Sequence, residues 1–438
     1  MSQPSLDGAR AWCVLAAGFV SAILCHGIPN AMGVYYMDIQ QHFDIEARHT
    51  TLLVGLPLMM QTLSGLLSSL LYGVLGSRCA ILVGGCLASL GCAGGYFANR
   101  VWQLACTQAA LGIGSGIVVT PQMAVQTEYF EKYIHFALVI LSVGGAVGMA
   151  IWSPACAALI SAMGWQASLL VIGAVALNQI PCALIMRPYH HQIVKGDKDK
   201  DEQKEEPKQS RGSWKDLFDI GLLKNPLFLV TMFLAFILFG NFMVYITMLN
   251  AFMSSHGFER ADGAALLSAT GISSLAGRVC AAIATRLITF SGCIVLGVSL
   301  ALCGLQLILL TVCTQFWHYT LVCVTFGFFQ GCAIAYGPPT FLEMFGAKHK
   351  FHRVIGMSSF FIGFTVLAIP QVVGRLAEQS MDRAFVYVGL VGLAGALGFV
   401  VLGVFLHVSH KRSRSRTQRQ TIEDMNSDEP EVDANLVL

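Results

Sequence analysis

Long runs without a charged side chain dominate this sequence of 438 residues and restrict its fold more than any other feature. An α-helix needs about 20 predominantly apolar residues to cross the roughly 30 Å hydrocarbon core of a bilayer. Runs of this length without Asp, Glu, Lys or Arg occupy residues 11–37, 50–77, 79–99, 101–127, 225–258, 354–374 and 384–408. Each is expected to form one membrane-spanning helix.

Two further uncharged runs are long enough for a pair of spans. Residues 133–186 are interrupted at "SAMGWQ", and residues 287–342 are interrupted at "CTQFWH". These short polar or aromatic interruptions predict a helical hairpin in each run. With the stretch "LLSATGISSLAGRVCAAIA", which contains Arg278, the sequence predicts twelve transmembrane helices.

The composition supports an all-α membrane protein. Hydrophobic residues make up 55% of the chain and charged residues only 12%, whereas soluble domains carry about 25% charged residues. The first uncharged run is longer than the roughly 7–15 apolar residues of a cleavable signal peptide. We therefore expect the first helix to remain in the protein.

The positive charges predict an orientation. If both termini face the cytoplasm, the cations left on the outer side are Arg48, Arg100, Arg260 and Arg383. This distribution follows the positive-inside bias of membrane proteins. Both termini are therefore expected to be cytoplasmic.

The two halves of the sequence echo each other. The segment from Glu128 to Pro154 resembles the segment from Glu343 to Pro370 at a half-length offset. Parallel six-helix repeats are the arrangement of the major facilitator fold, in which the substrate site lies between the halves near the midplane. We expect an N-terminal bundle at 1–188, a charged cytoplasmic linker at 189–224, a C-terminal bundle at 225–410 and a disordered cytoplasmic tail at 411–438.

Motifs for other chemistry are missing from the sequence. The 14 cysteines are scattered without metal-ligand or CxxC spacing. The glycine-rich "GSGIVVTP" and "GGAVG" stand inside predicted helices rather than in a strand-turn-helix context, so they predict close helix packing and not nucleotide binding. We expect no cofactor, no metal, no nucleic-acid partner and no enzymatic activity.

Four segments carry a family resemblance. "DGARAW" precedes the first helix, "YFEKYIHFALVILSVGGAVG" leads into the fifth, "GWQASLLVIGAVALNQIPCALIMRP" forms the sixth, and "LFDIGLLKNPLFLV" leads into the seventh. In these segments the chain resembles the monocarboxylate transporter family (solute carrier family 16) of the major facilitator superfamily. The first two of these segments correspond to signature sequences of that family and depart from them. Ala9 and Ala11 stand at usual glycine positions, and Tyr133 and Ile134 replace a basic run after Lys132.

The resemblance implies a function and partners. It implies a plasma-membrane transporter that moves a small organic carboxylate by alternating access, as a symporter in many members, with the lipid bilayer and a single-span ancillary subunit as partners. Two alternatives stay open. One is a facilitator of aromatic amino acids or related zwitterions, which the short match "GIPNAMG" favours. The other is a sensor or partner-binding protein that retains the transporter fold without transport.

Arg278 is the principal candidate for substrate binding. It lies about 14 residues, or roughly 21 Å, from the outer end of the eighth helix, where the resemblance places an arginine that binds the substrate carboxylate. No Asp or Glu lies in the middle of a predicted span, so the sequence supplies no carboxylate to neutralise the guanidinium there. The alternatives for Arg278 are carbonyl or water contacts, or a side chain that reaches toward the cytoplasm.

Three polar residues are expected to line the transport path with Arg278. Proton-coupled members carry a lysine in the first helix and an aspartate one turn before the arginine, and this chain has Asn30 and Ser274 at those positions. His26 lies one turn before Asn30 and shares its helix face. Because an unperturbed histidine titrates near pH 6.5, it could couple protons, contact substrate or simply pack. Proton coupling is therefore doubtful.

Five charged residues near the cytoplasmic ends are predicted to have gating or structural roles. Arg78, in "GVLGSRC", belongs to a degraded form of the loop motif between the second and third helices. A positive-inside anchor is the alternative for this residue. The others are Asp7, Glu128, Lys132 and Glu343.

Overall fold

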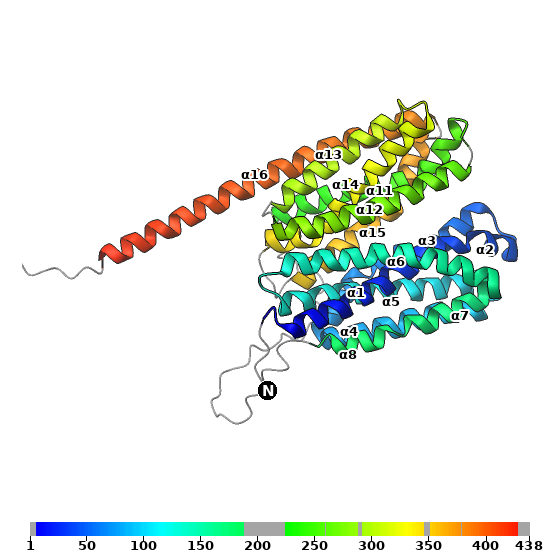
Figure 1. Cartoon of the computed structure of the whole chain (residues 1–438), viewed down its shortest axis with the longest axis horizontal. Helices are drawn as coiled ribbons and strands as arrows, with labels where there is room; N and C mark the ends of the chain where they lie inside the picture. The colour runs from blue at the N-terminus through cyan, green and yellow to red at the C-terminus, as the bar shows by residue number, and fades with distance from the viewer. Residues whose placement is uncertain are drawn as a thin grey trace, which may run out of the picture.

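The computed structural model describes residues 6–187, 224–258, 260–287, 291–345, 351–377 and 379–427. Within these ranges every regular element is a helix. Figure 1 shows the helices gathered into two adjoining bundles, the N-terminal one in blue to green and the C-terminal one in green to red.

The N-terminal half contains six spans that follow the uncharged runs. Its elements are α1 (Ala9–Ala31), η1 (Met32–Tyr35), α2 (Tyr36–Phe43), α3 (Ala47–Leu63), α4 (Gly65–Gly94), η2 (Gly95–Phe97), α5 (Val101–Tyr129), α6 (Ile134–Met163), α7 (Trp165–Ala176) and α8 (Gln179–Ile185). The hairpin expected at "SAMGWQ" is present, because Gly164 ends α6 with a φ of 82° and α7 starts at the next residue. Positive φ favours glycine, which lacks the Cβ that would clash.

Two breaks divide the region of the second and third spans. Ser64 separates α3 from α4, so the second span is made of α3 and the first part of α4. Gly76 then adopts a φ of 76° inside α4 and forms the sharp turn into the third span. The turn coincides with "GVLGSRC", where the sequence predicted the loop.

The C-terminal half repeats this pattern with longer uninterrupted helices. Its elements are α11 (Pro226–Ser255), α12 (Arg260–Leu287), α13 (Gly292–Leu310), α14 (Phe316–Phe345), α15 (Phe351–Ala377) and α16 (Met381–Ser427). The hairpin expected at "CTQFWH" lies between α13 and α14. Glu128 lies one residue before the end of α5 and Glu343 two residues before the end of the corresponding helix, α14, as the internal repeat requires.

The described helices account for twelve spans. Ten segments are long and apolar enough to cross a membrane, and α15 contributes a shorter apolar stretch, Phe351–Val366. The division of α4 at Gly76 supplies the twelfth span. The predicted fold, an all-α membrane protein with two six-helix bundles, is confirmed.

The described residues cover only part of the linker and tail that the sequence predicted outside the bundles. The expected linker lies almost entirely outside the described residues. Residues 411–427 were expected to be disordered, but α16 continues as a helix to Ser427. Arg, Lys and Gln, which are frequent in this stretch of the sequence, have high intrinsic helix propensities. Residues 428–438 lie outside the described part of the chain.

The halves pack most closely at one end of the molecule. We call it the linker end, because α1 begins, α8 ends and α11 begins there. One buried apolar cluster at this end combines Leu15, Phe130 and Ile134 of the N-terminal half with Phe228 and Phe351 of the C-terminal half. At the opposite end the two large buried clusters each draw on one half only. The structure is therefore closed between the halves at the linker end, and the described residues form no such shared core at the other end.

Candidate functional site

Close packing of α1 and α6 places His26 near the boundary between the halves. A Cβ on Gly27 would lie 2.5 Å from Trp152 and 2.7 Å from the backbone of Gly148, so only glycine permits this crossing. The ring of His26 then faces α6, 3.4 Å from where a Cβ on Gly145 would lie. The "GGAVG" segment therefore has the packing role that the sequence predicted for it.

A proline in α1 determines a second contact in this region. Pro29 has no N–H, so it cannot bond to the carbonyl of Cys25 four residues earlier. Gln61 of α3 supplies the missing donor, with Nε2 2.6 Å from the Cys25 oxygen. The same amide nitrogen lies 3.4 Å from His26 Nδ1. Gln61 thus joins α3 to α1 and contacts the candidate histidine.

Close packing of α12 and α14 sets the direction of Arg278. A Cβ on Gly277 would collide with the carbonyl of Phe328, and one on Gly331 would collide with the carbonyl of Ser274. These contacts turn the glycine face of α12 toward α14. Successive residues of an α-helix are rotated by about 100°, so Arg278 points away from α14 and reaches α6.

Arg278 makes a hydrogen bond across the boundary between the halves. Its Nη1 donates to the backbone oxygen of Ser142 on α6 at 2.8 Å. The side chain is only 8% exposed. His26 packs against Gly145 three residues further along α6, so both candidate residues contact the same part of this helix.

The guanidinium retains free donor capacity. Arginine has five N–H donors, and one bond, to Ser142, is found among the described residues. The buried Nε has no hydrogen-bond partner there. The ion pairs found in the described part of the chain involve His49 with Glu46 and His256 with Asp382, not Arg278. A buried cation of this kind is favourably placed to receive an anion.

Asn30 and Ser274 occupy less direct positions. Asn30 donates from Nδ2 to the carbonyl of His26 at 2.7 Å, so its amide is engaged with its own helix. Ser274 is half-buried one turn before Arg278, and its backbone packs against Gly331. The structure aligns both residues along the faces that carry His26 and Arg278, without a direct bond to the guanidinium.

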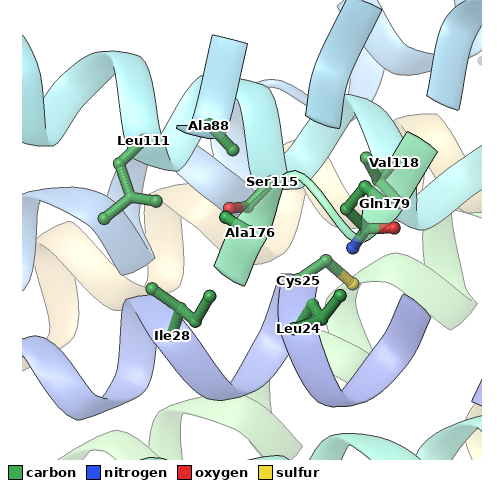
Figure 2. A pocket seen from close by; sticks show the side chains of 9 residues that line it. All are labelled: Leu24, Cys25, Ile28, Ala88, Leu111, Ser115, Val118, Ala176 and Gln179. Atoms are coloured by element: carbon green, nitrogen blue, oxygen red, sulfur yellow. The ribbon is translucent and has the colours of Figure 1, made fainter. Parts of the chain in front are cut away.

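A small cavity beside this site does not serve it. Figure 2 shows the cavity within the N-terminal half, between Cys25 and Leu24 of α1 and residues of α4, α5, α7 and α8. Its volume of about 10 Å³ is close to the minimum for a single water molecule. It is a packing defect rather than a substrate cavity.

The two glutamates expected at helix ends lie at the linker end. Tyr72 donates to Glu128 Oε1 at 2.7 Å, and the Tyr72 ring lies 4.7 Å from the ring of His352 on α15. Glu128 therefore supports a contact between the halves. Glu343 Oε2 accepts from the backbone N–H of Gly292, the first residue of α13, at 3.3 Å. A carboxylate at a helix start is stabilised by the helix dipole.

Asp7 joins two of the four segments that carry the family resemblance, "DGARAW" and the segment that leads into the fifth span. Its carboxylate accepts from the backbone N–H groups of Glu131, Lys132 and Tyr133, at 3.1–3.4 Å, just before α6 begins. Asp7 and Lys132 thus belong to one structural corner at the linker end. Arg78 is half-buried immediately after the Gly76 turn.

Sequence reasoning missed Gln61 and Ser142. Gln61 lies in an uncharged run, and the sequence alone does not show what a single amide there contacts. Pro29 in α1, however, indicated that one backbone carbonyl needs a hydrogen-bond donor from another helix. Ser142 contacts Arg278 through its backbone oxygen, and every residue has that group. Within the described residues no cluster of three or more His, Cys, Asp or Glu side chains could hold a metal.

Comparisons with known proteins show which family this chain is related to. The pattern of the Major Facilitator Superfamily matches residues 13–370, from α1 to α15. Monocarboxylate transporter 3 of Rattus norvegicus is 26% identical over 432 residues, covering 98% of this chain and 86% of that protein. Monocarboxylate transporter 11 of Homo sapiens is 31% identical over 183 residues, covering 42% of this chain and 39% of that protein.

A solved structure shows the same fold at low sequence identity. It is that of the major facilitator superfamily proton:xylose symporter XylE bound to 6-bromo-6-deoxy-D-glucose. It matches with a TM-score of 0.70 and 10% identity, over 91% of this chain and 95% of that chain. The two-bundle fold of this chain is thus the fold of that solved structure.

Proposed function

This chain belongs to the Major Facilitator Superfamily, and from that premise we propose that it is a secondary transporter of a small organic carboxylate that works by alternating access. The resemblance to monocarboxylate transporters that the sequence indicated is confirmed by relatives that cover nearly the whole chain. The protein is a multi-pass membrane transporter of a small molecule, and its relatives are transporters rather than enzymes. The carboxylate is our specific proposal.

The observation that supports this proposal is the state of Arg278. A charge at the centre of a membrane helix is costly unless it is paired or faces a polar cavity. Arg278 is 8% exposed, lacks a carboxylate partner among the described residues and has a buried Nε without an acceptor. A planar carboxylate matches the fork of a guanidinium and can accept two parallel hydrogen bonds from it. Substrate binding would therefore offset the cost of burying this cation.

His26 and Gln61 complete the proposed site from the N-terminal half. Their ring and amide lie 3.4 Å apart, on α1 and α3, while Arg278 lies on α12 and contacts α6. A substrate bound among them would touch both halves. Such a position suits alternating access, in which the halves move around a site near the midplane. Asn30 and Ser274 would tune selectivity along the same path.

The cellular setting forms part of the proposal. We expect the plasma membrane, with both termini in the cytoplasm, because the outer side carries few cations. A protease map that places residues 189–224 outside the cell would contradict this orientation. A single-span ancillary subunit is proposed from the family resemblance alone.

Uptake into proteoliposomes tests the proposed substrate class. Purified protein is reconstituted, and radiolabelled small carboxylates are compared with their methyl esters and with zwitterionic aromatic amino acids. We expect saturable uptake of at least one carboxylate and none of its ester, because the ester cannot accept the charge-assisted pair of hydrogen bonds. Uptake restricted to amino acids would redirect the assignment to a zwitterion facilitator. Binding of a carboxylate without flux would indicate a sensor.

A further inference from the structure

An open apolar groove runs along the outer surface where α6 meets α12. These two helices belong to different halves and lie side by side in Figure 1. The groove has a volume of about 450 Å³ and is lined by Phe136, Ile140 and Val143 of α6 and by Val279, Ile283 and Leu287 of α12. The three α12 side chains are 41–76% exposed. In a membrane these side chains face lipid.

The linker end of this groove carries cations stacked on aromatic rings. The guanidinium of Arg286, which also lines the groove, lies 4.6 Å from the ring centre of Phe136 and 5.4 Å from that of Tyr133. Lys132 Nζ lies 5.3 Å from the centre of the same Tyr133 ring. A stacked guanidinium keeps the N–H donors at its edges available for bidentate contacts with phosphate. Neither cation forms an ion pair within the described residues.

The shape of the groove favours a lipid chain over a protein helix. Transmembrane helices associate through small residues that let their backbones approach. The groove instead presents long or branched side chains, and its small residue, Ala282, is buried at 4% exposure. A flexible acyl chain can follow such a surface, and a volume of this size lies in the range of ligand sites.

We propose that this groove binds one anionic glycerophospholipid, with its phosphate on Arg286 and Lys132 and an acyl chain between Ile140 and Ile283. The anionic headgroup is complementary in charge to Arg286 and Lys132, and the apolar groove beside these cations is complementary to the acyl chain. The lipid would contact both halves at the end where they are closed. It would therefore stabilise the conformation that is closed at the linker end.

Photo-crosslinking tests the site directly. The full chain is reconstituted in phosphatidylcholine vesicles that contain a trace of phosphatidylserine with a photoreactive acyl chain, and labelled peptides are identified by mass spectrometry. We expect the label to concentrate in residues 133–143 and 279–287 and to be displaced by unlabelled phosphatidylserine but not by inorganic phosphate. Arg286→Gln should reduce this label about fivefold, since one basic side chain near an anionic surface contributes about 1 kcal/mol.

Two matched pairs of variants separate the headgroup contact from the groove. Arg187→Gln removes an exposed cation at the end of α8 and should leave the label unchanged. Ile283→Trp fills the groove without changing charge and should reduce the label, whereas Val298→Trp on the exposed surface of α13 should not. Equal labelling in Arg286→Gln, even labelling of other helices, or equal labelling by a photoreactive phosphatidylcholine would overturn the proposal. The proposal would also be overturned if, in cells, these peptides were crosslinked to a protein and not to a lipid.

Discussion

Nη1 of Arg278 on α12 donates a 2.8 Å hydrogen bond to the backbone oxygen of Ser142 on α6, and the bond joins the two halves of the molecule. The same guanidinium has a buried Nε without an acceptor. The cation therefore belongs both to a contact between the halves and to the proposed carboxylate site. A substrate that recruits the free donors would change the balance between open and closed states, which is what coupling of binding to alternating access requires.

Locking the linker end should stop transport. The rings of Tyr72 and His352, on α4 and α15, lie 4.7 Å apart in the closed arrangement. In a background without other cysteines, Tyr72→Cys with His352→Cys should react with a short bifunctional thiol reagent that is cleavable by reduction. We expect carboxylate uptake to fall to background after crosslinking and to recover after reduction. Each single variant, treated alike, should keep its uptake, and full transport by the crosslinked protein would exclude movement of these helices apart.

Gln61 and Pro29 should be energetically coupled. Gln61→Leu leaves the carbonyl of Cys25 without its 2.6 Å partner, and we expect a loss of about 1 kcal/mol in stability. Pro29→Ala supplies an N–H at the position that can bond to that carbonyl, so Gln61→Leu should cost less in this background. The measurement is thermal unfolding in detergent for the four proteins of the double-mutant cycle. Strict additivity would show that Gln61 does not serve the carbonyl that Pro29 leaves free.

The sequence predicted the spans well because a membrane-spanning helix requires a long apolar segment, and the composition shows where such segments lie. Uncharged runs predicted α1, α5 and α11 closely, and the break at "GVLGSRC" fell at Gly76. The contacts within the site could not be predicted in this way. Sequence singled out Arg278 and His26, but their neighbours depend on helix rotation, which is set by glycines that act only through their contacts with other helices. The helical continuation to Ser427 was missed because polar composition alone does not distinguish an extended helix from a disordered tail.

Two glycines in the same part of the chain should respond differently to alanine. Gly27→Ala would place a Cβ 2.5 Å from Trp152 and 2.7 Å from Gly148, whereas no atom lies within 4 Å of a Cβ on Gly33. We expect Gly27→Ala to lower stability by about 1–3 kcal/mol, as overpacking does, and to reduce transport by moving His26. Gly33→Ala serves as the control, with stability and uptake close to those of the unmodified protein. Equal behaviour of the two variants would contradict the α1–α6 crossing described above.

Transport should depend less on an inward proton gradient than in family members that carry the lysine and aspartate. Asn30 and Ser274 occupy those positions, and neither side chain titrates in the physiological range. His26 is a titratable group that contacts the same part of α6 as Arg278, at Gly145 and Ser142 respectively. Uptake is compared with and without an imposed pH gradient, at fixed external pH and clamped potential, in the unmodified protein and in His26→Gln. We expect a small gradient effect in both.

The outcome of that comparison assigns the proton. Strong accumulation driven by the gradient in both proteins would contradict the uncoupled account and exclude His26 as the coupling group. Accumulation that is lost only in His26→Gln would instead assign coupling to this histidine.

The most direct test of the central claim is carboxylate uptake by Arg278 variants in proteoliposomes. Arg278→Lys keeps the charge but loses the planar fork, and Arg278→Gln loses the charge. Arg375→Lys alters an exposed arginine near the end of α15 and provides the control. With equal amounts of folded, reconstituted protein, we predict that both Arg278 variants lose at least about tenfold in uptake rate, the equivalent of 1.4 kcal/mol, while Arg375→Lys keeps its rate. Near-normal carboxylate uptake by Arg278→Gln would contradict the account and leave Arg278 as a structural link to Ser142.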